Sequence, residues 1–161
     1  MSMGSHQSSA MITDNWLTPP AIIRALGDFD LDPCTCDAMP WKTADKQFTL
    51  ADDGLTQDWG DNRVWLNPPY SREAVKWLRL MAKHNHGTAL VFARTETAWF
   101  FETVWRAASA VLFLEGRLHF HYPDGTRAKA NAGAPSCLVA YGRFDSYKLA
   151  DSGLAGYFVT L

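Results

Sequence analysis

Asn67, Pro68, Pro69 and Tyr70 are the residues of this sequence whose types and spacing most suggest chemistry. A residue before proline is pushed into the extended region, and proline fixes its own φ, so positions 67–69 are stiff and extended. The prolines carry no N–H, which leaves their carbonyl oxygens as acceptors. The Asn67 side-chain oxygen and the Pro68 carbonyl can then accept both N–H groups of one planar amine. Tyr70 can stack on the flat ring that carries this amine.

This arrangement suits methyl transfer to an exocyclic amine. The lone pair of such a nitrogen is delocalised into its ring, and two acceptors that hold both N–H bonds favour a geometry in which the lone pair faces the incoming methyl group. The gain comes from orientation and from stabilising the developing positive charge. A base in a duplex must be flipped out to reach such a site. On its own, N-P-P-Y is also an ordinary turn, and its position in the fold decides between the two readings.

The elements around this motif predict an α/β fold. The region between residues 34 and 62 has little helix signal, and the loop 123–135 is small, polar and basic. Ser71 is placed to cap the helix that follows the motif. The patterns of apolar residues predict helices over 19–27, 72–86 and 97–109, strands over 28–33, 46–50, 63–66, 88–93 and 110–115, and an antiparallel C-terminal strand pair formed by 117–122 and 136–142.

Three predicted strands end in polar residues. Asp32-Pro33 ends one strand, Asn67 to Tyr70 end another, and Arg94-Thr95 ends a third. Ligands of open α/β sheets bind outside the carboxyl ends of the strands, so these ends are expected at one edge. The position of N-P-P-Y therefore favours a site over a turn.

Length and composition limit the function classes. The chain has 161 residues, 47% of them hydrophobic, which fits one domain over 15–161 without a separate target-recognition domain. Residues 1–14 are predicted to be a disordered tail, part of which resembles a cloning remnant. The net charge of −2 gives no global attraction to nucleic acid, so DNA would be held by a local basic surface. Three cysteines and the lack of a long apolar run favour a cytoplasmic protein with no membrane segment.

The order of these motifs resembles the phage-type DNA adenine-N6 methyltransferases, the Dam family. The resemblance covers about residues 15–142, and D-P-C followed by D-G-L-x-x-x-W and N-P-P-Y is more specific than N-P-P-Y alone. The landmarks that carry it are 16-WLTPPAIIRAL-26, 29-FDLDPC-34, 52-DDGLTQDW-59, 65-WLNPPYS-71, 93-ARTETAWF-100, 116-GRLHF-120 and 134-APSCLVAYG-142.

The resemblance implies a Rossmann-like, S-adenosylmethionine-dependent methyltransferase sheet, acting on DNA in the cytoplasm of a host cell if the gene is phage-encoded. Asn67 to Tyr70 would hold the target adenine. Asp32-Pro33-Cys34 resembles the start of the cofactor motif, and Thr18-Pro19-Pro20 resembles a segment beside the methionine part of the cofactor. Asp53 is similar to the acidic position near the adenosine, with Asp52 and Asp58 as neighbours that the sequence does not rank.

The sequence departs from the family after Cys34, where related enzymes often have a glycine-rich loop and residues 35–41 contain no glycine. Two other functions therefore stay open. One is an amino-methyltransferase that acts on RNA or on a protein glutamine, since N-P-P-Y occurs there too. The other is a non-catalytic DNA- or cofactor-binding phage protein.

Other reactive residues support weaker hypotheses. The C-x-C and H-x-H spacings of Cys34/Cys36 and His119/His121 fit zinc ligands poorly, so no metal is expected. Cys34 is not expected to act as the nucleophile of a cytosine C5 methyltransferase, because Tyr70 stands where those enzymes have cysteine. Three basic residues are candidates for substrate binding. Arg94 could hold a phosphate or the carboxylate of the cofactor, or it could simply pair with Glu96. Arg127 and Lys129 could contact DNA phosphates or remain solvated.

Overall fold

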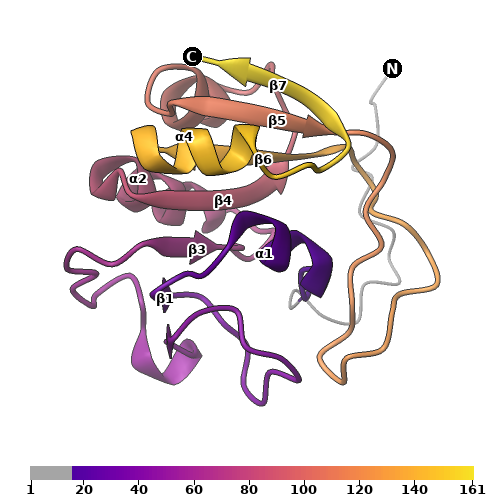
Figure 1. Cartoon of the computed structure of the whole chain (residues 1–161). Coiled ribbons are helices and arrows are strands. Elements are labelled where there is room, and N and C mark those ends of the chain that lie inside the picture. Colours follow the sequence, from indigo (N-terminus) through magenta and orange to yellow (C-terminus); the bar gives the residue numbers. More distant parts are fainter. Residues whose placement is uncertain (1–15) are drawn as a thin grey trace.

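The structure is a computed structural model that describes residues 16–161 (Figure 1). The predicted tail over residues 1–14 lies outside the described residues. The helices are α1 (Pro20–Leu26), α2 (Ala74–His84), α3 (Ala98–Phe100) and α4 (Arg143–Ala150), with the short turns η1 (Leu50–Asp52) and η2 (Phe101–Trp105). The strands are β1 (Leu31–Asp32), β2 (Lys46–Gln47), β3 (Val64–Leu66), β4 (Gly87–Phe92), β5 (Ala110–Leu114), β6 (Ser136–Tyr141) and β7 (Gly156–Thr160).

The strands of the described chain form one mixed sheet in the order β2-β1-β3-β4-β6-β5-β7. β2, β1, β3 and β4 run parallel to one another. β6 lies antiparallel between β4 and β5, and β7 pairs antiparallel with β5. The prediction of an α/β fold is confirmed. The carboxyl ends of β1, β3 and β4 lie at one edge, as the sequence predicted for their polar residues.

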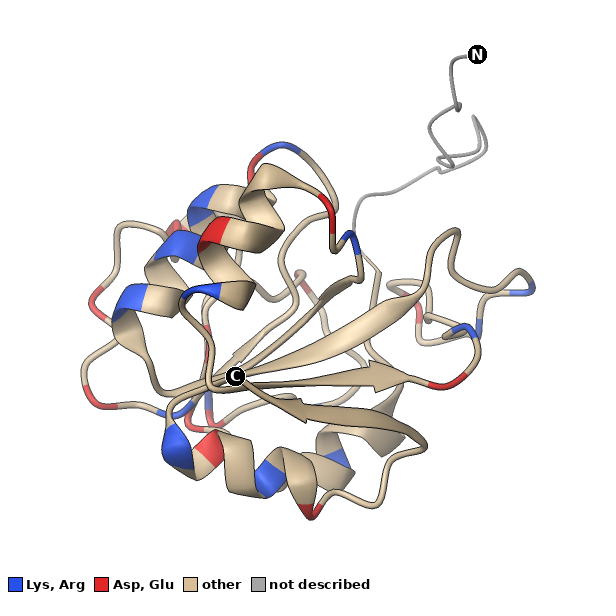
Figure 2. Cartoon of the chain, turned by 90° about the horizontal axis from the view of Figure 1, so that it is seen from above, with Lys and Arg blue, Asp and Glu red and all other residues tan. Residues whose placement is uncertain are grey.

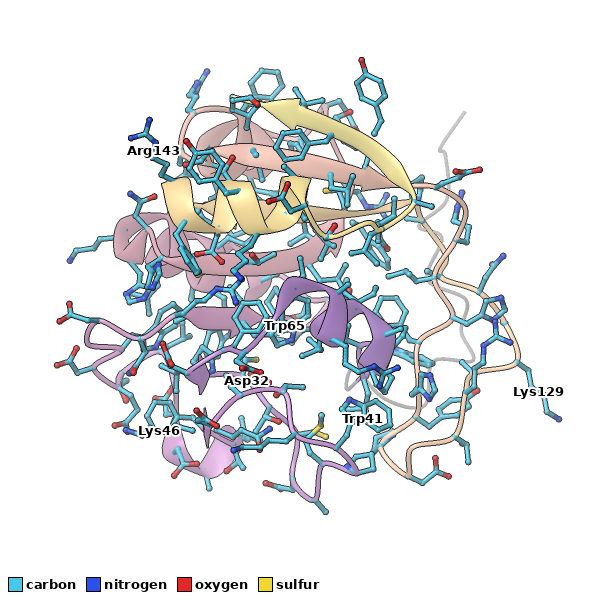
Figure 3. The ribbon with its side chains drawn as sticks, in the orientation of Figure 1. Asp32, Trp41, Lys46, Trp65, Lys129 and Arg143 are labelled. Carbon is cyan, nitrogen blue, oxygen red and sulfur yellow. The ribbon has the colours of Figure 1, made fainter. Side chains whose placement is uncertain are left out.

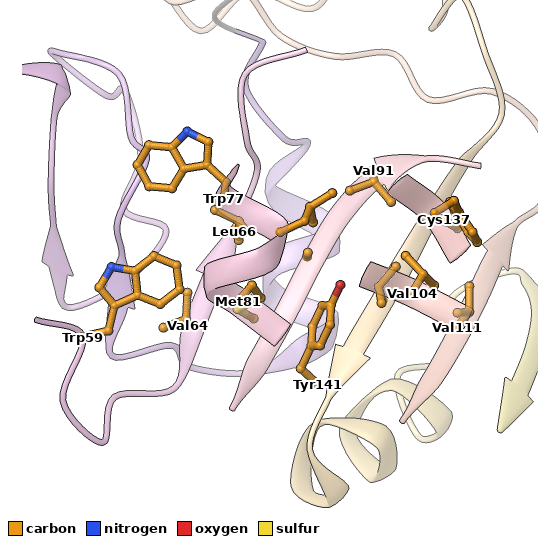
Figure 4. Packing of buried hydrophobic residues seen from close by; sticks show 14 of the residues in the cluster. Trp59, Val64, Leu66, Trp77, Met81, Val91, Val104, Val111, Cys137 and Tyr141 are labelled. Atoms are coloured by element: carbon orange, nitrogen blue, oxygen red, sulfur yellow. The ribbon is translucent and has the colours of Figure 1, made fainter. Parts of the chain in front are cut away.

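Helices cover both faces of this sheet (Figure 2). On one face Trp77, Leu78 and Met81 of α2 pack with Phe100 of α3 and Val104 of η2 over the sheet (Figure 4). On the other face the buried side chains come from α1 and α4 and include Ile22, Leu26 and Leu149. No described helix has the length and apolar character needed to cross a membrane.

Helix α2 follows the N-P-P-Y motif and forms because its apolar residues recur on one side. Trp77, Leu78 and Met81 are buried, while Lys76 and Arg79 are exposed. The helix ends at Asn85, whose left-handed φ of 56° is a common way to end a helix. The prediction that Ser71 is the N-cap is wrong, because the N-cap is Glu73. Ser71 instead accepts the Glu73 N–H, at 3.2 Å, in the turn before the helix.

The predicted pairing of 117–122 with 136–142 is wrong. β6 has β4 on one side and β5 on the other, so it offers no edge to a further strand. Residues 117–122 instead make isolated antiparallel bridges, in which His121 faces Leu17 and Arg127. The sequence analysis also did not predict α4 or β7, and the strands predicted over 28–33 and 46–50 are only the two-residue β1 and β2.

A buried ion pair ties the sheet to α4. The Arg63 guanidinium lies 2.8 Å from the Asp145 carboxylate, and the exposed fractions of the two side chains are 6% and 0%. Arg63 also donates to the carbonyls of Leu26 and Asp28, and its guanidinium lies over the ring of Phe29. Burial raises the pKa of Asp145, and the Arg63 charge acts in the opposite direction.

Candidate active site

A cavity of about 390 Å³ opens at the carboxyl edge of β1 and β3. This volume is within the usual range of small-molecule sites. Its lining combines the polar strand ends with the segments before α1 and around η1. The lining residues are Trp16, Leu17, Thr18, Asp32, Cys34, Thr35, Cys36, Asp37, Met39, Thr43, Thr49, Leu50, Asp53, Gly54, Leu55, Trp65, Asn67, Pro68, Pro69, Tyr70, Glu73 and Trp77.

Asn67 follows directly after β3 and is part of the cavity lining. Its Nδ2 donates to the main-chain oxygen of Trp16, at 2.7 Å. Its Oδ1 is buried and has no hydrogen-bond partner within the described part of the chain. A buried acceptor without a partner is costly, and such an atom in a cavity is suited to a ligand that donates. Pro68 and Pro69 line the cavity beside it and bring no N–H that would compete.

The ring of Tyr70 also lines the cavity and is held by other aromatic rings. Its centroid lies 4.4 Å from that of Phe92, and the two planes are tilted by 34°. Phe120 meets it edge-on, with centroids 5.7 Å apart. Burial raises the pKa of the Tyr70 phenol, so the hydroxyl stays neutral at physiological pH. Tyr70 is therefore a rigid, uncharged aromatic surface, of the kind that a flat ligand can contact.

Asp32 ends β1 and is a buried carboxylate at the cavity wall, labelled in Figure 3. Its oxygens accept hydrogen bonds from the Thr43 hydroxyl and from the Cys34 N–H. Burial raises the pKa of Asp32 to about 6, although both hydrogen bonds lower it. Thr43 was not singled out from the sequence, because nothing in the local pattern shows that the chain returns to Asp32 there.

The loop around Asp53 lies directly against the end of β1. Gly54 packs so closely that a Cβ there would lie 2.0 Å from the Pro33 carbonyl oxygen. Pro33 is buried under this contact and does not line the cavity. Asp53 lines the cavity and has a left-handed backbone with φ of 50°. The D-P-C and D-G-L landmarks are therefore brought together by a backbone contact that only glycine permits.

The three acidic candidates near η1 differ in their surroundings. Asp52 accepts hydrogen bonds from the main-chain N–H and the hydroxyl of Thr49. Asp58 accepts the Gly60 N–H, at 2.9 Å. Only Asp53 of the three lines the cavity. The structure thus places Asp53, but neither neighbour, at the cavity.

The segment before α1 forms another wall. Thr18 is 2% exposed, and its hydroxyl oxygen is buried without a hydrogen-bond partner among the described residues. Pro19 and Pro20 lie outside the cavity lining, where they are the N-cap and the first residue of α1. Trp16 also lines the cavity, a role that the W-L-T-P-P landmark alone did not predict.

The loop after Asp32 takes its path without glycine. Ala38 adopts a positive φ of 53°, a conformation in which glycine is more usual.

Burial and the nearby Asp32 charge raise the pKa of the Cys34 thiol to about 12, so it is not a thiolate at neutral pH. Among the described residues, no cluster of three or more His, Cys, Asp or Glu side chains could bind a metal ion.

The three basic candidates lie outside the cavity lining. Arg94 follows β4 at the same edge, with its guanidinium 5.9 Å from the centre of the Phe92 ring. Arg127 and Lys129 are exposed on the loop 123–135, and Lys129 extends away from the rest of the molecule (Figure 3).

All the charged side chains that line the cavity are acidic. Asp32, Asp37, Asp53 and Glu73 all contribute to it, and no Lys, Arg or His side chain of the described chain does. Such a site favours a cationic ligand and disfavours a phosphate. The exposed Leu50, at 92% of its possible surface, adds an apolar side chain at the cavity.

The sequence is similar to known proteins. Residues 5–150 match the family model described as DNA N-6-adenine-methyltransferase (Dam). A protein of Escherichia phage T1 named DNA N-6-adenine-methyltransferase is 34% identical over 115 residues, which cover 66% of this chain and 47% of that protein. This chain therefore spans about half the length of the phage T1 relative.

A second relative is matched over more of its length. The DNA N-6-adenine-methyltransferase of Haemophilus phage HP1 is 34% identical over 138 residues, which cover 80% of this chain and 78% of that protein. No solved structure matches the chain significantly. The family model extends over most of the chain and includes all the residues that line the cavity. The chain belongs to the Dam family of DNA adenine-N6 methyltransferases.

Proposed function

We propose that this protein transfers the methyl group of S-adenosylmethionine to the N6 amine of a flipped adenine in DNA. The observation that carries the proposal is the Oδ1 of Asn67, a buried acceptor in the cavity lining that has no hydrogen-bond partner among residues 16–161. This oxygen and the Pro68 carbonyl would accept the two N–H groups of the amine. Pro69 would stiffen the corner, and Tyr70 would contact the base. Family membership supports the same reaction and the same class of substrate.

The cavity fits S-adenosylmethionine in charge. The cofactor carries a sulfonium, an ammonium and a carboxylate, so its net charge is positive, and the cavity lining is acidic. When bound, it supplies an electrophilic methyl group. We propose that Asp32 and Asp53 hold it, with Cys34 and the segment Thr18–Pro20 beside it and Pro33 supporting the loop. The Thr18 hydroxyl, which has no hydrogen-bond partner in the described chain, is one polar group to which the cofactor could bind.

The fold and the exposed cations support a place for DNA. Asp32 ends β1 and Asn67 follows β3, and these two strands are adjacent and parallel, an arrangement consistent with a Rossmann-like methyltransferase sheet. Arg127 and Lys129 are proposed to contact phosphates, and Arg94 a phosphate or the cofactor carboxylate. Because both relatives come from phages of bacteria, we propose that the protein acts in the cytoplasm of a bacterial host.

The test is methylation by the purified protein of DNA, RNA and glutamine-containing peptides in parallel, with products identified by mass spectrometry. N6-methyladenine in the DNA alone is the expected product. Methylation confined to RNA or to peptide would show that the substrate is RNA or protein and not DNA. Cofactor binding by calorimetry without turnover on any DNA would favour a non-catalytic binding protein.

Asn67→Ala is the variant that tests the site itself. Loss of the acceptor should lower kcat by roughly 100-fold or more, as removal of a key polar group does in other enzymes. The affinity for S-adenosylmethionine should change little, because Asn67 is assigned to the amine. Near-wild-type turnover would show that the assignment is wrong. Ser71→Ala, at an exposed residue beside the motif, is the matched control.

A further inference from the structure

The amide of Asn67 is held from one side by main-chain atoms far away in the sequence. Its Nδ2 donates to the Trp16 oxygen at 2.7 Å, across a separation of 51 residues. An amide is planar, so fixing its nitrogen also fixes the direction of its oxygen. A free amide could turn over and present Nδ2, a donor, to an amine that is itself a donor. The hydrogen bond to Trp16 therefore selects the acceptor face.

The Trp16 carbonyl is in turn held by the segment around residue 121. Leu17 and His121 exchange both of their main-chain hydrogen bonds, at 2.9 and 3.0 Å. The Trp16 ring packs against Tyr122, with centroids 5.4 Å apart, and against Phe120, at 6.4 Å. Trp16 lies outside every helix and strand of the described chain, so these contacts, rather than a regular element, determine where its carbonyl points.

The segment around residue 121 is itself braced. The His121 Nδ1 lies 3.0 Å from the Gly125 carbonyl, and its ring meets Trp41 edge-on, with centroids 5.1 Å apart. A chain of contacts thus runs from the base of the loop 123–135, through Trp16, to Asn67. All of these contacts are made between described residues of the protein itself and are present without a bound ligand.

We propose that Trp16 is a positioning residue for methyl transfer, which keeps the Oδ1 of Asn67 turned toward the substrate amine. The proposal rests on the proposed function of Asn67. It also accounts for an amide at position 67. An aspartate would offer an acceptor to the substrate but no donor to the Trp16 carbonyl, and its second oxygen would face that carbonyl at hydrogen-bond distance.

The first test does not depend on activity. The side-chain amide signals of Asn67, identified in a ¹⁵N spectrum by their loss in Asn67→Asp, should be shifted and slow to exchange in the wild-type protein. Trp16→Ala should move them toward the values of a free amide, and Trp16→Phe should restore most of the shift. Unchanged Asn67 signals in Trp16→Ala would overturn the proposal, whatever the activity of the protein.

The second test separates positioning from binding. Trp16→Ala should lower kcat on DNA by roughly 10- to 100-fold, with the dissociation constant of S-adenosylmethionine changed by less than about threefold. Trp99→Ala, which removes a partly buried tryptophan outside the cavity, should keep the wild-type kcat in protein that is shown to be folded. An equal loss of kcat in both variants would assign Trp16 a purely structural role.

Asn67→Asp gives a variant of unchanged size in case Trp16→Ala does not fold. It keeps an acceptor for the amine and loses the donor to Trp16, so its kcat should fall by a similar factor. Full activity of Asn67→Asp would overturn the proposal and leave the proposed function intact. If the wild-type protein methylates no DNA, the proposed function fails, while the spectra still show whether Trp16 holds the amide.

Discussion

At the scale of single residues, Asp32 is a carboxylate of the cavity lining whose charged form is disfavoured by burial. The pKa of Asp32 is about 6 in the folded protein, against an ordinary value of 3.8. The folded state therefore binds this proton more tightly than the unfolded chain. The contribution of Asp32 to the free energy of unfolding is full below about pH 3.8 and is lost as the pH rises through about 6.

Asp32→Asn should remove this dependence. Relative to the wild type, the variant should gain on the order of 2–3 kcal/mol in free energy of unfolding between about pH 3.5 and pH 7, because asparagine does not titrate. Urea unfolding at several pH values measures this difference, and the comparison across pH cancels any fixed cost of the altered hydrogen bonds. Asp61→Asn, at an exposed carboxylate, is the control. Parallel pH profiles for the wild type and Asp32→Asn would contradict the expectation.

At the scale of elements, one close backbone contact joins the loops that build the cavity. The Cα of Gly54 faces the Pro33 carbonyl, and no side chain fits between them. Gly54→Ala should push the Asp53 loop away from the end of β1. The free energy of unfolding should fall by about 1–3 kcal/mol, as in other overpacked sites. The affinity for S-adenosylmethionine, measured by calorimetry, should fall as well.

Gly153→Ala is the control for this prediction. Gly153 has φ of +71°, and a Cβ at this position would meet no atom within 4 Å, so alanine there introduces backbone strain without a collision. This variant should lose some stability and keep its affinity for the cofactor. If Gly54→Ala binds the cofactor as tightly as Gly153→Ala does, the contact with Pro33 does not shape the cavity.

Some helices and strands could be predicted from the sequence, and others could not. Strands such as β4 are continuous apolar runs, and α2 has an apolar face, so local patterns determine both. Residues 117–122 also alternate, but Phe120 is buried against Trp16 and Tyr70 rather than in a strand pair. The pattern reports which side chains are buried, whereas the partner of a strand depends on which edges of the sheet are already taken.

The candidate site could be predicted in part for a similar reason. Asp32, Asn67 and Tyr70 lie at the carboxyl ends of strands, and the rule that parallel strand ends share an edge places them together. The contributions of Thr43 and Trp16 depend on how irregular segments return to the sheet, and no periodic pattern encodes those paths. Pro33 and Gly54 were recognisable as landmarks, but their contact is visible only in three dimensions.

At the scale of the whole molecule, the Arg63–Asp145 pair joins the start of β3 to α4 across 82 residues of sequence. Removing Asp145 leaves the buried Arg63 guanidinium without its carboxylate partner. Removing Arg63 leaves the buried Asp145 carboxylate with only the His86 ring, at 3.4 Å, and the Thr88 hydroxyl. Arg63→Met and Asp145→Leu should each lower the free energy of unfolding by about 3–5 kcal/mol. The double variant should lose clearly less than the sum of the two, because it leaves no buried charge of this pair.

Urea unfolding of the wild type, both single variants and the double variant completes the cycle. Lys42→Met is the control. It breaks the ion pair between Lys42 and Asp45, in which the side chains are 63% and 77% exposed, and it should have a much smaller effect.

The Arg63–Asp145 pair should also affect how the layers open. Since α4 and α1 cover the sheet face opposite α2, weakening this pair should loosen the α1/α4 layer as a unit. Hydrogen exchange should therefore rise in α4 before it rises in α2. A cost no larger than that of Lys42→Met, or uniform exchange in both helices, would show that the pair does not hold the layers together.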